Sequence, residues 1–213
     1  MKTNFRGGCM KLKVVGIIFA ATMLAAPAFA DAIFTLGNHP QPNEQNILFG
    51  TNQMGATVNG FTNQTNTLVQ FSSTTDTLGV TSNGQAKVTA ADGLVNDLTI
   101  TVPGHTFSDF ILNPFDPAAN NDLTISVTMS DGTVFTFGPY GSINGNNFLT
   151  ITTTGGELIS SVTIDSPGGF GDLRQPRVSG ISGVTTVPEP SSLLLFGSGA
   201  LGLIGVLRRK LVG

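Results

Sequence analysis

Apolar and polar residues alternate in short runs through the middle of this chain. Leu98-Thr99-Ile100 and Val162-Thr163-Ile164, for example, each place two apolar side chains on one face of a strand and a threonine on the other. Gly, Pro, Asn and Asp turn signals separate the runs, and this period of two predicts an all-β body. The strands are expected over residues 32–36, 47–49, 57–61, 67–72, 78–81, 86–90, 97–102, 106–112, 123–128, 134–137, 148–152, 159–164 and 173–178.

Two turn signals predict β-hairpins. Ser130-Asp131-Gly132 separates the ninth and tenth expected strands, and Gly155-Gly156 separates the eleventh and twelfth. We expect residues 31–181 to form a jelly-roll or immunoglobulin-like two-sheet β-sandwich. A β-solenoid is the main alternative, but no fixed repeat period supports it.

The N-terminus reads as a secretory signal peptide over residues 1–30. Lys11 and Lys13 precede an apolar run, and Ala28-Phe29-Ala30 supplies the small-x-small pattern of a cleavage site, with Asp31 as the first mature residue. This predicts a signal helix, and a buried N-terminal helix is the alternative. Translation could begin at either Met1 or Met10.

The C-terminus has three parts in sequence. Residues 182–190 form a linker that ends in Val187-Pro188-Glu189-Pro190, and residues 191–207 are an apolar run of 17 residues. Such a run spans roughly 26 Å as a helix, which predicts a transmembrane helix at the short end of the usual range. Arg208, Arg209 and Lys210, within the basic tail at 208–213, would stay cytoplasmic and leave the body outside.

These three parts together resemble a PEP-CTERM sorting signal. The resemblance implies a Gram-negative bacterium that makes exopolysaccharide, and an exosortase that acts near the Pro-Glu-Pro and sends the body to the cell exterior. The partners it implies are exosortase, the secretion translocon, signal peptidase and the inner membrane before processing. An ordinary tail anchor is the alternative.

Residues 164–181 weakly resemble the final strand of galactose-binding-like sandwiches. In that fold the last strand returns to pair near the first. The resemblance implies a sandwich and leaves a carbohydrate-binding module open as an alternative function.

Charge and composition limit the classes of partner that the body is expected to bind. The formal charge of the whole chain is −3, but residues 31–186 hold three basic and twelve acidic residues, which gives −9. A surface this acidic repels phosphate backbones, so nucleic acid is not an expected partner. The only cysteine, Cys9, precedes the expected cleavage site, so the mature body must be held together without disulfides.

No catalytic constellation stands out. A serine, His105 and Asp109 could form a triad, but no nucleophile-elbow motif supports it, and His39 and His105 both lie in turn sequences. The chain has no Trp and Tyr140 is its only Tyr, although aromatic platforms are common in glycosidase clefts. We therefore expect no enzyme activity, with a secreted hydrolase as an alternative.

Calcium is the one cofactor that the sequence suggests. Asp116 and Asp122 lie in one Asn- and Asp-rich loop and Asp131 lies in the next turn, and calcium prefers such oxygen donors. The alternative is that these side chains only shape their own turns. The sequence as a whole predicts a non-enzymatic exported protein, sorted by exosortase to the cell surface or the exopolysaccharide matrix.

Overall fold

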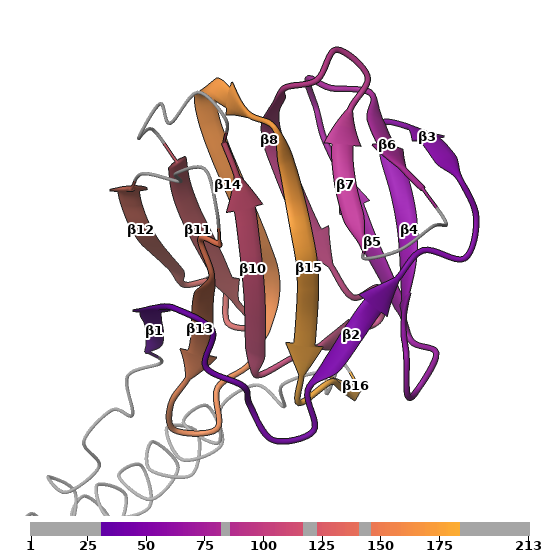
Figure 1. Ribbon diagram of the computed structural model, residues 1–213. Helices are drawn as coiled ribbons and strands as arrows, with labels where there is room; N and C mark the ends of the chain where they lie inside the picture. Colours follow the sequence, from indigo (N-terminus) through magenta and orange to yellow (C-terminus); the bar gives the residue numbers. More distant parts are fainter. Residues whose placement is uncertain (1–30, 82–85, 117–122, 141–145, 184–213) are drawn as a thin grey trace, which may run out of the picture.

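A computed structural model describes residues 31–81, 86–116, 123–140 and 146–183 of the chain (Figure 1). About 64% of these residues lie in strands and none lies in a helix, which confirms the all-β prediction. Within these ranges there is accordingly no helix long and apolar enough to cross a membrane. The expected signal helix, transmembrane helix and basic tail lie outside the described residues.

Sixteen strands are described. In chain order they are β1 (Ala32–Leu36), β2 (Gln45–Leu48), β3 (Gln53–Gly55), β4 (Thr57–Thr62), β5 (Leu68–Ser72), β6 (Leu78–Val80), β7 (Lys87–Ala90), β8 (Val95–Thr101), β9 (His105–Thr106), β10 (Asp109–Phe115), β11 (Leu123–Met129), β12 (Val134–Tyr140), β13 (Leu149–Thr153), β14 (Ile159–Phe170), β15 (Asp172–Ser179) and β16 (Ser182–Gly183).

The strands form two layers that β2 joins. In Figure 1, β10 and β15 lie in front of β14 and β8. The front layer runs β1-β13-β10-β15, and β7, β6 and β3 continue it beyond β15; the back layer runs β4-β5-β8-β14-β11-β12. β2 pairs with β15 through Gln45 and Asn46 and with β4 through Ile47 and Leu48, so it crosses from one layer to the other. All these pairings are antiparallel.

Alternation along the strands builds the core between the layers. Leu98, Ile100, Val162 and Ile164 are fully buried, while Thr163 between the last two is not. Four phenylalanines fill much of the remaining space; they are Phe71, Phe107, Phe110 and Phe170. Burying one such side chain contributes about 1.5–3 kcal/mol, so the packing of these strands supplies the stability that a chain without disulfides requires.

The two layers meet without hydrogen bonds on one side. β1 and β12 are the two ends of the strand path, and the Phe34 and Phe137 rings stack between them with centroids 5.3 Å apart. Tyr140 continues the aromatic contact, 5.4 Å from the Phe137 ring. The sheet is therefore nearly closed, with aromatic packing in place of a last strand pairing.

One of the two expected hairpins is present. β11 and β12 pair around Asp131-Gly132 as predicted. The hairpin expected around Gly155-Gly156 is wrong, because β13 pairs with β1 and β10 in the front layer and β14 pairs with β11 and β8 in the back layer. The glycines do make a turn, but that turn connects the two layers.

A second crossing divides a strand that was expected to be continuous over 106–112. Phe107 exchanges backbone hydrogen bonds with Ile159 of the back layer, at 3.1 and 2.7 Å. From Asp109 onward the chain pairs with β13 and β15 of the front layer. The change of layer at Ser108 therefore separates β9 from β10.

The weak galactose-binding-like resemblance implies that the last strand returns to pair near the first. β15 pairs with β10, β7 and β2, whereas the first strand, β1, pairs with β13. The last long strand thus returns beside the second strand. The jelly-roll or immunoglobulin-like type stays a prediction.

Candidate functional site

A concave site lies beside β15, where its neighbouring strand changes from β7 to β2. Leu173 and Arg174 pair with β7, and Arg177 and Val178 pair with β2. Because β2 turns away after Asn46 to join the back layer, a gap remains between the start of β7, at Lys87, and the point where β2 leaves β15. We call this gap, of about 400 Å³, the β15 hollow; it is lined by Asn46, Ile47, Leu48, Ala86, Gln175, Pro176 and Arg177.

The backbone N–H groups at the gap need no strand partner. The Gln175 N–H donates to the Ala86 carbonyl oxygen at 2.9 Å, and Pro176 has no N–H to leave unpaired. Gln175 achieves this with φ at 48°, in the left-handed region that non-glycine residues seldom adopt. β15 therefore leaves no backbone N–H unpaired at the point where its neighbouring strand changes from β7 to β2.

Arg177 forms one wall of the hollow and fixes the loop that leads into β2. Its Nη1 lies 2.9 Å from Glu44 Oε1 and 3.2 Å from Asn38 Oδ1. Its guanidinium also lies 5.4 Å from the centre of the Phe148 ring. The same loop is held further along by Thr150, whose hydroxyl accepts from the His39 N–H at 3.1 Å and donates to the Gly37 carbonyl at 2.8 Å.

A second hollow of about 490 Å³ lies on the far side of Arg177. Its lining residues are Leu36, Gly37, Asn38, Tyr140, Asn146, Asn147 and Phe148. The Tyr140 hydroxyl is buried and has no hydrogen-bond partner among the described residues. Burial also raises the pKa of Tyr140 above its ordinary value. Asn38 and Phe148 line this hollow and contact Arg177, which lines the β15 hollow, so the two hollows are neighbours.

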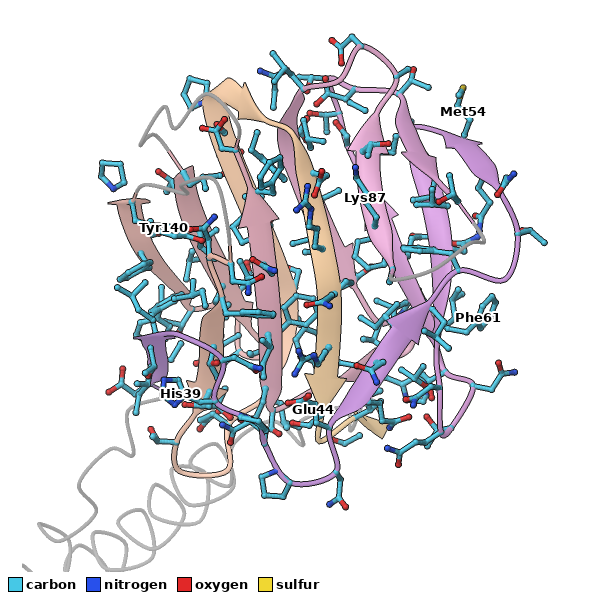
Figure 2. The ribbon with its side chains drawn as sticks, viewed as in Figure 1. His39, Glu44, Met54, Phe61, Lys87 and Tyr140 are labelled. Atoms are coloured by element: carbon cyan, nitrogen blue, oxygen red, sulfur yellow. The ribbon has the colours of Figure 1, made fainter. Side chains whose placement is uncertain are left out.

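The three basic residues of the body all lie along this face, next to acidic partners. Lys87 Nζ lies 2.9 Å from Asp172 Oδ2, and Arg174 Nη2 donates to the same oxygen at 3.1 Å. Arg174 also covers the Phe115 ring at 3.7 Å. With Arg177 paired to Glu44, each cation of this face has a carboxylate neighbour (Figure 2 labels Lys87 and Glu44).

A pair of carboxylates lies on the outer face of the back layer. Asp97 of β8 and Asp165 of β14 are direct cross-strand partners. Burial raises the pKa of Asp97, but hydrogen bonds from the Ser73 and Thr75 hydroxyls and the Thr74 and Thr75 N–H groups outweigh it and leave the pKa well below its ordinary value. Burial, and then the charge of Asp97, raises the pKa of Asp165.

The structure does not assemble the triad that the sequence allowed. The Asp109 carboxylate accepts from the hydroxyls of Ser108 and Ser179, the latter at 2.8 Å. His105 lies in β9, paired through its backbone to β16. His39 contacts the Leu36 carbonyl through Nε2 at 3.0 Å.

The calcium candidates are only partly described. Asp131 lies in an exposed turn, where its carboxylate accepts from the Thr133 N–H at 2.8 Å and the Thr133 hydroxyl at 2.9 Å. These hydrogen bonds lower the pKa of Asp131. Asp116 is 1% exposed, and Asp122 lies outside the described residues. Among the described residues no three His, Cys, Asp or Glu side chains are placed to hold a metal, and the calcium site stays a prediction.

The sorting residues lie beyond the last strand, outside the described part of the chain. Residues 186–210 match the family described as the PEP-CTERM protein-sorting motif. The chain carries a PEP-CTERM sorting motif. The matched range contains Val187-Pro188-Glu189-Pro190 and Arg208, Arg209 and Lys210. No curated protein and no solved structure matches the chain.

Sequence reasoning missed both hollows. Local sequence does not locate the β15 hollow, because that hollow exists only where two strands that are distant in sequence meet β15. A weak signal was present in Gln175-Pro176, since a proline in a central strand indicates an irregular or unpaired position.

Proposed function

We propose that the protein is an exported, non-enzymatic β domain that exosortase recognises through the PEP-CTERM motif and delivers to the cell surface or the exopolysaccharide matrix. The observation that carries this proposal is the match over residues 186–210, which begins just after β16 ends at Gly183. A processing enzyme needs an accessible segment, and Pro188 and Pro190 disfavour regular structure there.

The proposal includes the topology of both ends. Residues 1–30 are the signal peptide and residues 191–207 the transmembrane helix that holds the body outside the inner membrane until processing. The position of β1 supports the first of these. Cleavage after Ala30 would leave Asp31 as the first residue, one residue before β1 begins, and the Asp31 carbonyl accepts from the Thr154 N–H at 3.2 Å.

The test is the intact mass and location of the protein in an exosortase-positive strain and its exosortase-null partner. We expect a mature N-terminus at Asp31 in both strains and loss of the tail near Pro188-Glu189-Pro190 in the positive strain only. A variant with alanine at Pro188, Glu189 and Pro190 should keep its tail in both strains, and Thr185→Ala should be processed normally. An unchanged, membrane-held tail in the positive strain would refute exosortase processing.

A carbohydrate-binding body remains the second candidate, because the β15 hollow combines amide side chains with an apolar floor. The absence of Trp from the chain weighs against a stacking platform of the usual kind. A secreted hydrolase would require the carboxylates or His105 to converge on one hollow. None of Asp97, Asp165, Asp109 and His105 lines either of the two hollows described above.

A further inference from the structure

We propose that the β15 hollow is a binding site for a neutral saccharide, with the side-chain amides of Asn46 and Gln175 as its hydrogen-bonding groups. The inference concerns the body alone and goes beyond the sorting proposal. Its test does not depend on whether exosortase processes the tail.

The first argument is hydrogen-bonding capacity that the fold does not use. The backbone of Asn46 bonds to Asn63 and that of Gln175 to Ala86, but neither side-chain amide bonds to another described residue. An amide offers donors and an acceptor side by side. A sugar hydroxyl is also both donor and acceptor, so two free amides in one hollow complement a polyhydroxylated ligand better than an ion or a hydrocarbon.

The second argument is the apolar floor and rim. Ile47 and Pro176 are buried beneath the hollow, and Leu48 at its edge is 47% exposed. Phe61, the cross-strand partner of Leu48, is 40% exposed and extends the apolar rim onto β4 (Figure 2). The C–H face of a sugar ring requires such a surface, while its hydroxyl edge requires the amides. Ligand hollows of 300–1,000 Å³ that combine an apolar lining with a few polar groups are typical binding sites.

The third argument is the backbone of Gln175. A left-handed conformation costs a residue with a Cβ atom of the order of 1 kcal/mol or more, and glycine would avoid that cost. Glutamine stands there instead, and it is one of the residues that line the hollow. Strain of this kind concentrates at ligand sites.

Charge favours a neutral ligand over an acidic one. Arg177, the cation of the hollow, is paired with Glu44 at 2.9 Å, and Lys87 and Arg174 nearby share Asp172. The body as a whole has a formal charge of −9, from three basic and twelve acidic residues in 31–186. A polyanion would meet long-range repulsion without an unpaired cation to bind it.

The second hollow extends the same site. Arg177 separates the two hollows and lies over Phe148, and Asn38 lines the far side. A short oligosaccharide that lies across Arg177 would place one sugar in each hollow. We therefore expect oligosaccharides to bind more tightly than the corresponding monosaccharides.

The test is isothermal titration calorimetry on the full chain in a zwitterionic detergent, which has no sugar headgroup. The probes are short neutral oligomers of glucose, galactose, mannose and xylose, with short oligouronates as the acidic arm. We expect one-to-one binding of at least one neutral oligomer, and a loss of about three- to tenfold in affinity for both Gln175→Gly and Asn46→Ala, as one neutral hydrogen bond is removed in each.

Gln175→Gly has a matched control in Asn66→Gly. Asn66 also has a positive φ, of 55°, but it lies in the turn after β4 and is not one of the residues that line the β15 hollow. Both variants relieve the same strain and should unfold at the same or a higher temperature than the parent, while only Gln175→Gly should weaken binding. The proposal is overturned if no neutral oligomer binds, if the affinity survives both hollow variants, or if oligouronates bind and neutral oligomers do not. Each of these outcomes leaves the mass of the processed protein, and so the sorting proposal, untouched.

Discussion

Replacing Asp165 by asparagine should stabilise the fold at neutral pH. Asp165 lies directly opposite Asp97 across β14 and β8. Burial and the negative charge of Asp97 raise the pKa of Asp165, so the folded state holds the Asp165 proton more tightly than the unfolded state does. Stability therefore falls as the pH rises through this titration, and at pH 7 the ionised Asp165 opposes folding.

The size of the effect follows from the cross-strand spacing. Directly opposed residues have Cβ atoms about 5 Å apart, where two like charges repel by about 0.8 kcal/mol even at the dielectric constant of water. This separation is shorter than the Debye length at physiological salt, so screening removes only part of the repulsion. Since Asp165 is only partly desolvated and its surface is largely exposed, we take this fully solvated value of about 0.8 kcal/mol as the expected gain, equivalent to about 2–3 °C in Tm for a domain of this size.

Thermal unfolding of the full chain, followed by circular dichroism at pH 7 and pH 3, measures this gain. Asp165→Asn should raise Tm at pH 7 and lose most of that advantage at pH 3, where Asp165 is protonated in the parent. Glu157→Gln removes the same unit of charge from the acidic body and controls for its net charge. The reasoning fails if Asp165→Asn is no more stable than Glu157→Gln at pH 7, or if its advantage is as large at pH 3.

Two further substitutions test the hydrogen bonds to Asp97 and the close approach of Gly138 to β11. Asp97→Asn should cost about 1–2 kcal/mol at pH 7, even though it also relieves the repulsion with Asp165, because an uncharged amide accepts more weakly from Ser73, Thr74 and Thr75. The pKa of Asp97 is lowered in the folded state, so the stabilisation by the Asp97 carboxylate is present above about pH 4 and is lost as the pH falls. A series of Tm measurements on Asp97→Asn and the parent from pH 2 to 7 would show this loss. A cost of the substitution that does not change with pH would contradict the reasoning. Gly138→Ala should cost at least about 2 kcal/mol in urea unfolding, because φ is 129° there and the added Cβ would lie 2.5 Å from the Leu123 carbonyl oxygen. Gly93→Ala, with φ of 94° and open space around it, should cost less, and equal costs would show that the contact with Leu123 is unimportant.

Much of the secondary structure was predictable because it follows from local alternation. Each expected strand range overlaps a described strand, and the apolar positions of Leu98-Thr99-Ile100 and Val162-Thr163-Ile164 face the core. Thr150 is an informative exception. Leu149-Thr150-Ile151 has the same alternation, which predicts that Thr150 points to solvent. Thr150 is instead 1% exposed, because the loop after β1 covers it and bonds to its hydroxyl.

The path of the chain between the layers was not predictable from the same pattern. A period of two shows which face of a strand is apolar, but both layers bury their apolar faces in one shared core. The pattern is therefore the same whether Gly155-Gly156 closes a hairpin or connects two layers. The β15 hollow depends on such a crossing, that of β2, and so it could not be found before the pairings of β15 were known.

The same pairings explain why processing at the two ends need not disturb the body. β1 begins at Ala32 and is held along its length by β13, and β16 is held by β9 through Ser182 and Gly183. Both strands lie toward the lower end of the molecule in Figure 1, so the chain enters and leaves the fold at one end. Cuts before Asp31 and near Pro188-Glu189-Pro190 would therefore remove residues outside every described strand pairing. The two hollows are formed by residues between Leu36 and Arg177, so a saccharide site there would be complete both before and after the tail is removed.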